Sequence, residues 1–260
     1  MSKKRRIIIF AAIAVLAVGL ILASTIFRVR RQNVQFNQEI EGVSAESIVN
    51  AGEIKNGKSI FLVNKNLAKE KIEKAVPYAK IEKIYITFPN TVNFVVSKRV
   101  EFCYFEKDDN FIICDNSLKI LRTSTEKPDL IKIDAKINDY QVGEFIPNAQ
   151  IAGMFEAFSE SITIEIDGSQ SPEITLSNAK ALESIKQITF DEINQVFRVE
   201  SSEGFFVEYD IKGAAQEKHY YLMGILVNNN SSILTNVERA SGKTFVLEKT
   251  SSGMRKYTKD

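Results

Sequence analysis

Residues 36–99 decide the fold of this chain, and they read FNQEIEGVSAESIVNAGEIKNGKSIFLVNKNLAKEKIEKAVPYAKIEKIYITFPNTVNFVVSKR. The apolar and polar residues follow the order strand, short capped helix, loop, longer helix and two alternating strands. That order predicts a small β-α-α-β-β module. An uncharged apolar segment ends shortly before it, so we expect the module to follow a membrane-spanning helix.

Capping residues and turn chemistry set the first half of the module. We expect a strand over 34–41 and then a short helix with Ser44 as its N-cap. Gly52 is expected to close that helix in the left-handed region. The apolar, β-rich segment 60–63 is expected to be extended.

The second helix begins at Asn64 or Asn66, and Pro77 stops it. Its apolar residues recur at i, i+4, i+7 and i+8, which predicts one buried stripe and an opposite face in water. The expected inward residues are Ala68, Ile72, Ala75 and Val76, and the expected outward residues are Lys69, Glu70, Glu73 and Lys74.

The two strands that follow can be placed in register. A three-residue loop over 89–91 puts both apolar patterns on one face, whereas a two-residue loop would put them on opposite faces. The three-residue loop therefore predicts that Phe88 and Phe94 are buried. The predicted facing pairs are Phe88 with Val92, Ile86 with Phe94, and Ile84 with Val96.

Residues 7–27 contain no charged side chain and read IIIFAAIAVLAVGLILASTIF. At about 1.5 Å per residue, a helix of this length matches the roughly 30 Å hydrocarbon core of a bilayer. A cleaved signal peptide is the alternative, but its apolar core spans only about 7–15 residues. We expect an uncleaved anchor with a cytoplasmic tail of residues 1–6, although the basic residues on both sides favour this orientation only slightly.

The near-neutral charge of the whole chain hides an acidic ectodomain. The first 31 residues hold seven Lys and Arg and no acid, which leaves 27 basic and 33 acidic residues in 32–260, a net charge of −6. Such a balance argues against nucleic acid as a partner. The roughly 230 residues outside the membrane suffice for two small domains.

Beyond Arg99 the pattern predicts many short strands and two helices, with a domain junction near 99–101. The whole chain is expected to be α+β: a transmembrane helix, the module over 34–99, a mostly antiparallel β domain over 100–250, and a flexible tail over 251–260. Residues 161–187 are assigned only loosely as strand and helix. The expected helices are 148–159 and 214–227, and the expected strands are 100–106, 111–115, 118–122, 130–134, 187–192, 194–201, 204–210, 232–238 and 243–249. The residues expected to face the core are Ile151, Phe155 and Phe158 on the first helix, Tyr221, Leu222, Ile225 and Leu226 on the second, and Phe245 and Leu247 on the last strand.

Two cysteines, Cys103 and Cys114, lie on strands that flank Asp108 and Asp109. If these two acids form a two-residue hairpin loop, the cysteines face each other at a hydrogen-bonded position. A cross-strand disulfide is geometrically open to them. Two buried free thiols are the more ordinary arrangement for so small a number of cysteines.

Residues 52–59 match the phosphate-binding pattern G-x-x-x-x-G-K-[ST] in every letter. That loop binds nucleotide because a strand precedes it and a helix follows it. Here a helical segment precedes the loop and an apolar, extended segment is expected after it. We therefore expect no nucleotide and no phosphate role for Lys58.

No constellation for catalysis or metal binding can be drawn from the sequence. His219 is the only histidine, and no Gly-x-Ser-x-Gly element accompanies it. With one histidine and two cysteines in a hairpin, no zinc site of usual spacing is present. We expect a protein that binds other proteins, with no enzymatic activity and no cofactor.

The residues also carry a family resemblance. The module resembles the POTRA domain of the FtsQ/DivIB bacterial division proteins, and the likeness continues into the start of that family's second, β-rich domain. A departure is Lys98-Arg99, where the family often has Glu-Arg. The matching elements are Gly42, Gly57–Asn64, Val76–Tyr78, Phe88–Thr91, Ser97–Arg99, Phe111–Asp115 and Leu118–Leu121.

The resemblance implies a single-pass protein at the division septum that scaffolds FtsL and FtsB/DivIC, two small single-span proteins. In that family the last strand of the β domain and the helix beside it receive the FtsB/DivIC partner. Those elements match 243–249 and 214–227 here, and an exposed terminal strand suits strand addition. The candidate partner-binding residues are Thr244, Val246 and Glu248 on the strand and Lys218 and Tyr221 on the helix.

Two other classes of function stay open at this point. A membrane-anchored extracytoplasmic sensor or regulator unrelated to division would need a substantial cytoplasmic domain, and a tail of six residues does not supply one. A cell-wall enzyme would need an assembled nucleophile, base or metal set. The division scaffold therefore fits the order of elements best.

Overall fold

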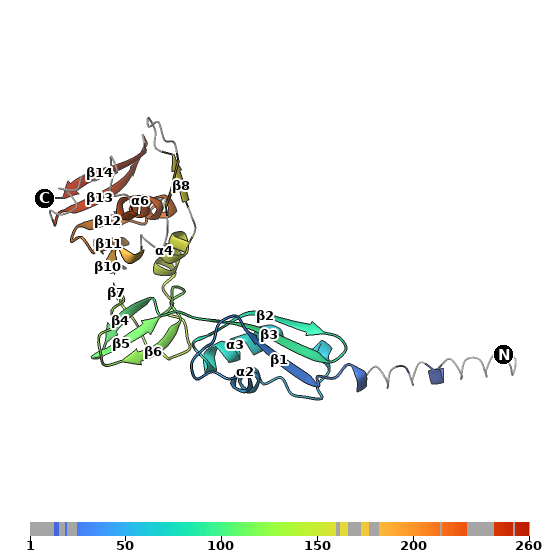
Figure 1. Ribbon diagram of the computed structural model, residues 1–260. Helices are drawn as coiled ribbons and strands as arrows, with labels where there is room; N and C mark the ends of the chain where they lie inside the picture. The colour runs from blue at the N-terminus through green and yellow to red at the C-terminus, as the bar shows by residue number, and fades with distance from the viewer. Residues whose placement is uncertain are drawn as a thin grey trace. The chain divides into compact units, whose positions relative to one another are not determined.

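The computed structural model describes residues 13–15, 19, 25–159, 162–165, 173–176, 182–213, 215–227, 242–251 and 253–259. The chain divides into two compact units, residues 1–99 (unit 1) and 100–260 (unit 2) (Figure 1). Among the residues that are described, no helix is both long and apolar enough to cross a membrane. Most of the apolar run 7–27 lies outside the described residues.

Unit 1 is a three-stranded sheet with two helices against it. Its elements are β1 (Arg31–Phe36), α2 (Ala45–Gly52), the 3₁₀ turn η1 (Ile60–Leu62), α3 (Lys65–Ala75), β2 (Ala79–Thr87) and β3 (Thr91–Lys98). The sheet order is β1-β3-β2, with β1 parallel and β2 antiparallel to β3. The β-α-α-β-β order is the one that the sequence predicts. The core includes Ile48, Ile72, Val92, Phe94 and Val96, all fully buried.

Several bounds in unit 1 differ from the predicted ones. The first strand covers 31–36 rather than 34–41, because its pairing with β3 starts at Arg31. Residues 60–62 form a 3₁₀ turn rather than an extended segment. The helix α2 closes at Glu53, which has a φ of 49°, while Gly52 is the last helical residue. Gly52 serves packing instead, since a Cβ there would lie 3.2 Å from the Ile72 side chain.

The predicted helix starts in unit 1 are confirmed. The Ser47 amide donates to the Ser44 hydroxyl at 3.1 Å, which caps α2. The Leu67 amide donates to the Asn64 side chain at 3.1 Å, so Asn64 rather than Asn66 caps α3. Each side chain satisfies a backbone donor that the first turn of a helix leaves without a partner.

The β2–β3 hairpin has a three-residue loop, as predicted, but the loop is 88–90 rather than 89–91. Thr87 therefore faces Thr91, and the apolar pairs are Ile86 with Val92 and Ile84 with Phe94. The predicted register was wrong by two residues, which keeps every side chain on its predicted face because the period of a strand is two. Phe88 falls in the loop and is 61% exposed, so its predicted burial is also wrong.

Glu73 is a further correction, because it is buried and does not face water. Its carboxylate binds the Arg99 guanidinium at 3.1 Å and accepts the Ile81 amide at 2.9 Å. The helical period predicts that Glu73 faces water with the other charged residues of α3. In the structure this position faces the start of β2. A buried ion pair therefore joins α3 to the last residue of unit 1.

Unit 2 is built on a nine-stranded sheet in the order β14-β13-β12-β11-β10-β7-β4-β5-β6, and β8 and β9 form a separate pair. Five of the eight pairings in the large sheet are antiparallel and three are parallel, which agrees with the predicted mostly antiparallel domain. The described strands are β4 (Cys103–Lys107), β5 (Asn110–Cys114), β6 (Ile120–Ser124), β7 (Ile131–Asp134), β8 (Ile162–Glu165), β9 (Glu173–Leu176), β10 (Ile185–Asp191), β11 (Val196–Ser201), β12 (Phe206–Asp210), β13 (Thr244–Thr250) and β14 (Gly253–Lys259). The described helices are α4 (Ala149–Ser159) and α6 (Ala215–Val227).

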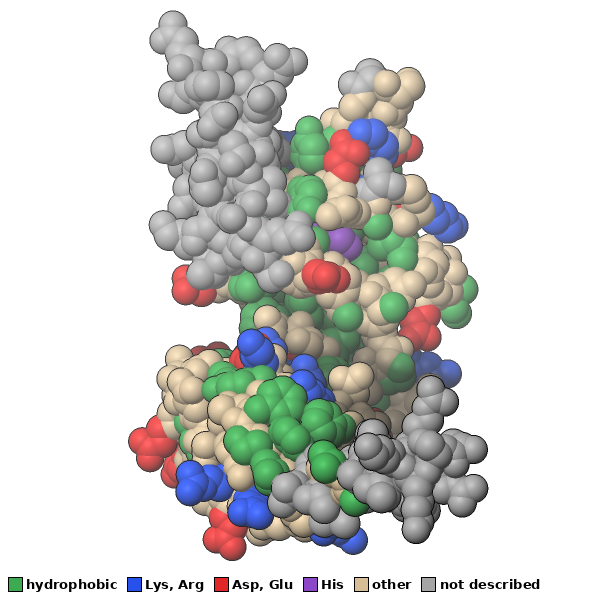
Figure 2. All heavy atoms as spheres, turned by 90° about the vertical axis from the view of Figure 1, so that its right-hand side faces the viewer, with side chains coloured by type: hydrophobic (Ala, Val, Ile, Leu, Met, Phe, Trp, Pro, Cys, Tyr) green, Lys and Arg blue, Asp and Glu red, His purple; other side chains and the backbone are tan. Residues whose placement is uncertain are grey.

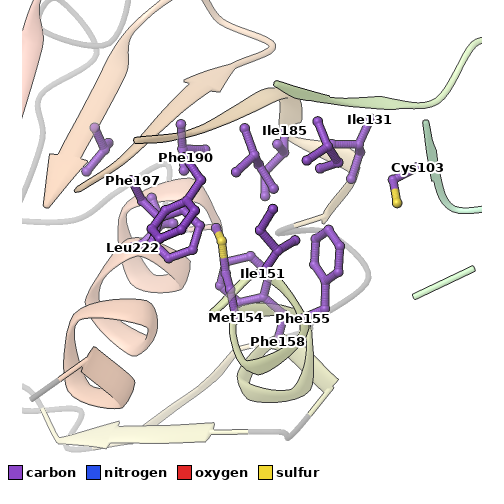
Figure 3. Close-up of a cluster of buried hydrophobic side chains, with 14 of the residues drawn as sticks. Cys103, Ile131, Ile151, Met154, Phe155, Phe158, Ile185, Phe190, Phe197 and Leu222 are labelled. Carbon is purple, nitrogen blue, oxygen red and sulfur yellow. The ribbon is translucent and has the colours of Figure 1, made fainter. Parts of the chain in front are cut away.

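The two described helices, α4 and α6, pack onto the large sheet, as their apolar spacing predicts. Figure 3 shows side chains of α4 and α6 meeting those of β7, β10 and β11 in one core. The helix α4 contributes Ile151, Phe155 and Phe158, which are at most 3% exposed. On α6 the predicted inward residues Leu222, Ile225 and Leu226 are buried, and Tyr221 is half-buried.

The C-terminal residues form a strand and not the predicted flexible tail. Gly253–Lys259 is β14, which pairs antiparallel with β13 over its full length. Its residues, GMRKYTK, are mostly polar and lack a clear alternation, so the sequence pattern did not predict a strand. The predicted strand 232–238 lies outside the described residues, as does much of 161–187, where the described parts include β8 and β9.

The cysteine hairpin has the predicted register. Cys103 faces Cys114, and the loop is Asp108-Asp109, both with positive φ. Both cysteines are free and buried. Burial raises the pKa of each thiol above its ordinary value, which keeps both groups protonated and unreactive.

Candidate partner-binding surface

The large sheet ends at the C-terminal strand β14. The sheet order makes β14 an edge strand, and none of the strands in the described ranges pairs with its outer side. An edge strand offers backbone amides and carbonyls to an incoming strand. This corrects the prediction that β13 is the edge, because β12 and β14 pair with its two sides.

The register of the β13–β14 hairpin shows which backbone groups point outward. Thr250 faces Gly253 across a connection of two residues. The pair next to such a connection exchanges backbone hydrogen bonds, and bonded and non-bonded pairs then alternate along the ladder. Met254 and Thr258 belong to non-bonded pairs, so their amides point away from β13 and lie along the open edge.

The two faces of this hairpin have different roles. Phe245 and Leu247 are buried, as predicted, on the face that belongs to the unit 2 core. The predicted contact residues Thr244 and Val246 are half-buried and Glu248 is exposed, on the opposite face. Val246 lies directly across from Tyr257, which is 49% exposed. The three predicted residues therefore share one accessible face.

That face continues over β12 and β11 as a charged surface. Glu208 lies beside Val246 in the parallel β12–β13 register, and its carboxylate binds Lys259 at 2.9 Å and Arg198 at 3.6 Å. The Arg198 guanidinium lies 4.3 Å from the centre of the Phe206 ring. These contacts connect the open edge to the centre of the sheet through side chains of β11, β12 and β14.

The helix α6 contributes less to this surface than the sequence predicted. Lys218 is only 2% exposed, and its ammonium group donates to the Asp210 carbonyl at 2.9 Å and binds the Asp210 carboxylate at 3.1 Å. Lys218 therefore ties α6 to the end of β12 and cannot be an exposed contact. Tyr221 is half-buried and packs against the core of unit 2.

His219 is also part of the structure of unit 2. Its Nδ1 atom and the Tyr209 hydroxyl are joined by a hydrogen bond of 3.0 Å, and both side chains are buried. Burial lowers the pKa of His219 from 6.5 to about 4 and raises the pKa of Tyr209 well above its ordinary value. The imidazole is therefore neutral at pH 7 and joins α6 to β12.

A cavity of about 530 Å³ lies between α4 and α6. Its lining is mainly small or polar and includes Gly153, Ala157, Ala215 and Gln216, with His219 at its side. No cluster of three metal-ligating side chains occurs in the described part of the chain. The loop 52–59 is preceded by α2 and followed by η1, so it lacks the strand and helix that phosphate binding requires.

Comparison with known proteins finds a relative for about half of the chain. No family model matches the chain. The cell division protein DivIB of Clostridium acetobutylicum is 29% identical over 133 residues, which cover 50% of this chain and 52% of that protein. The chain thus spans about half the length of the curated relative that it matches.

A solved structure also matches: the major extracytoplasmic domain of the trans isomer of the bacterial cell division protein DivIB from Geobacillus stearothermophilus. The match is 15% identical with a TM-score of 0.31, and it covers 52% of this chain and 99% of that chain.

Fold and surface together define a sheet-rich α+β protein in two units, with an open sheet edge at its C-terminal end. The match to DivIB supports assignment of this chain to the FtsQ/DivIB family of cell-division proteins. This is the family that its sequence resembles.

Proposed function

We propose that the chain is an extracytoplasmic scaffold of the bacterial division complex. In this proposal residues 7–27 anchor it in the cell membrane with residues 1–6 in the cytoplasm, and residues 34–99 are a POTRA domain. Unit 2 binds FtsL-like and FtsB/DivIC-like single-span proteins at the septum, where the assembly stabilises and regulates septal cell-wall synthesis. The scaffold has no enzymatic activity of its own.

One observation carries the proposal of partner binding: the open outer edge of β14. The edge is seven residues long and belongs to a strand that is held in place by the full β13–β14 ladder. Strand addition obtains its affinity from backbone hydrogen bonds and its specificity from side chains on the shared face. Val246 and Tyr257 supply apolar contacts there, and Glu248 supplies charge.

A proline at an outward-pointing position of β14 tests the proposal. Thr258→Pro removes one outward amide and keeps the amides that pair with β13. Loss of one backbone hydrogen bond, together with the bend in the edge, should weaken partner binding about tenfold. The measurement is a pull-down of FtsB/DivIC-like and FtsL-like chains with the full chain in detergent, after thermal melting has shown that the variant is folded.

Thr258→Ala is the matched control, because it removes the same exposed side chain and keeps the amide. The proposal expects full recovery of partners with Thr258→Ala and reduced recovery with Thr258→Pro. Equal recovery with both variants would contradict strand addition at β14 and would favour a partner-binding surface on unit 1. Val246→Pro is a poorer test, since β13 pairs on both sides and would lose ladder bonds.

The cellular role has its own test. Depletion of the protein should produce filaments or chains of unseparated cells. Normal division under full depletion would contradict the division role and favour a sensor or regulator unrelated to division.

A further inference from the structure

An exposed aromatic cluster lies at the end of unit 1 where the chain enters it. Phe27, Phe61 and Phe88 come from three distant segments, and their ring centres lie 5.4 Å (27–61), 5.9 Å (61–88) and 6.2 Å (27–88) apart. Phe61 is 66% exposed and Phe88 is 61% exposed, and Leu62 next to them is 67% exposed. We call these four side chains the entry cluster.

Phe27 packs against the core of unit 1, but the Phe61, Leu62 and Phe88 side chains are mostly exposed. Large apolar side chains that gather on a surface mark interaction sites for proteins or membranes. Figure 2 shows hydrophobic side chains gathered in the lower part of the face in view, with both basic and acidic side chains at their margin.

The link between the apolar run and unit 1 is short and fixed. The Ile60 amide donates to the Phe27 carbonyl at 2.9 Å. Two residues later, Val29 is fully buried, its amide donates to the Lys58 carbonyl at 2.9 Å, and its carbonyl accepts the Gly57 amide at 2.8 Å. Phe27 is both the last residue of the uncharged run and a member of the entry cluster, so no free linker separates the two.

The segments that supply the cluster are basic. The three segments that supply it, 25–38, 54–69 and 83–100, contain no Asp or Glu, although residues 32–260 as a whole carry a net charge of −6. Arg30, Arg31 and Lys58 are exposed in these segments. An apolar surface with basic residues around it is the composition that binds the headgroup and acyl boundary of anionic membranes.

We propose that the entry cluster inserts into the outer surface of the lipid bilayer and sets the position of unit 1 against the membrane. The proposal rests on the proposed anchor at 7–27. When that run spans the bilayer, Phe27 lies at the edge of the hydrocarbon core. The ring centres of Phe61 and Phe88 lie 5.4 Å and 6.2 Å from that of Phe27, so both rings lie near the same edge. Phe61, Leu62 and Phe88 then lie in the interfacial layer, with the basic side chains at the level of the lipid phosphates.

Tryptophan fluorescence provides the test, because the chain contains no tryptophan. The full chain is reconstituted into lipid vesicles of phosphatidylcholine and phosphatidylglycerol, with either ordinary or brominated acyl chains. Phe61→Trp introduces a single reporter at an exposed position that tolerates a larger ring. Insertion predicts about twofold lower emission in brominated than in ordinary lipid.

Two further reporters separate the proposals. Leu16→Trp, in the middle of the apolar run, should be quenched whenever the anchor spans the bilayer. Gln38→Trp lies just past the end of β1 that is farther from Phe27, and this position is exposed, so its emission should not respond to brominated lipid. Quenching of Leu16→Trp without quenching of Phe61→Trp would overturn membrane insertion of the cluster and leave the anchor intact. Absence of quenching at Leu16→Trp would contradict the anchor itself.

A second substitution tests whether the cluster acts together. Phe88→Ser in the Phe61→Trp chain should restore a large part of the emission, because it removes a neighbouring apolar ring from the bilayer surface. Thr87→Ser is the matched control at the adjacent exposed position and should change nothing. Equal quenching in both variants would show that the cluster does not insert as a unit and would contradict the proposal.

Discussion

Phe88 and Phe94 show how much a single position in a strand matters. They lie six residues apart on the β2–β3 hairpin, and alternation places both on the apolar face. In the structure Phe94 is fully buried and Phe88 is 61% exposed. The difference arises because the loop begins at Phe88, which removes it from the sheet.

The two phenylalanines therefore predict opposite results on truncation. Phe94→Ala should lower the free energy of unfolding by about 3–5 kcal/mol, because it leaves a cavity in the core of unit 1. Phe88→Ala should change it by about 0.5 kcal/mol or less, as is usual for surface positions. Chemical denaturation of the two variants beside the parent measures both. A large loss with Phe88→Ala would contradict the observed register.

His219 predicts a pH-dependent stability. Its pKa is about 4 in the folded chain and about 6.5 when unfolded, because burial disfavours the charged imidazole. As the pH falls, the imidazole of the unfolded chain is protonated before that of the folded chain. The contribution of neutral His219 to stability is therefore complete above pH 6.5 and is lost toward pH 4. Between pH 7 and pH 5 the loss should be about 2 kcal/mol.

Urea denaturation at pH 7 and pH 5 measures this loss. His219→Gln keeps an acceptor for the Tyr209 hydroxyl but cannot titrate in this range. Its stability should change less between the two pH values than that of the parent. Identical pH dependence in parent and variant would show that His219 is not buried as described.

At the scale of elements, the ion pair of Glu73 and Arg99 holds α3 to the end of β3. Both side chains are nearly fully buried, and the Glu73 carboxylate also accepts the Ile81 amide. Removal of one partner of a buried ion pair strongly destabilises the fold, because the other charge stays buried. Replacement of both charges by apolar groups is tolerated.

A double-mutant cycle tests this pair. Arg99→Met alone should destabilise unit 1 by about 3–5 kcal/mol. It leaves the buried Glu73 carboxylate with the more distant Lys69 ammonium group, at 3.8 Å, in place of the Arg99 guanidinium. Glu73→Leu combined with Arg99→Met should recover part of that loss. Thermal melts of the two single variants and the double variant supply the coupling free energy. Simple addition of the two single effects would contradict a direct interaction.

At the scale of the whole molecule, the proposed anchor defines which residues are accessible from outside the cell. We expect residues 7–27 to span the membrane uncleaved and everything from Val34 onward to lie outside. Protease added to intact spheroplasts should then remove both units. Protection of the units, or a mature N-terminus after Ala23, would contradict this topology.

The division of the chain between Arg99 and Val100 also assigns the proposed interactions to different units. The entry cluster belongs to unit 1, and the open edge of β14 belongs to unit 2. Substitutions at the two surfaces should therefore act independently, with Thr258→Pro affecting partner recovery and Phe88→Ser affecting membrane contact.

The sequence alone determined what depends on neighbours along the chain. Helix caps at Ser44 and Asn64, the two-residue turn at Asp108-Asp109 and the inward residues of α4 all follow from short-range chemistry and periodicity. The order of elements in unit 1 follows from the same signals. These features are predictable because the residues that cause them lie within a few positions of one another.

Only the tertiary structure decided what depends on distant residues. A strand register that shifts by two keeps all side chains on the same faces, so the hydrophobic pattern could not place Phe88 in the loop. The pairing of β14, and with it the position of the open edge, depends on a polar strand that finds its partner through backbone groups. The burial of Glu73 and Lys218 and the meeting of Phe27, Phe61 and Phe88 likewise depend on segments far apart in sequence. Periodicity reports which face a side chain takes, but only the folded chain determines which surface that face meets.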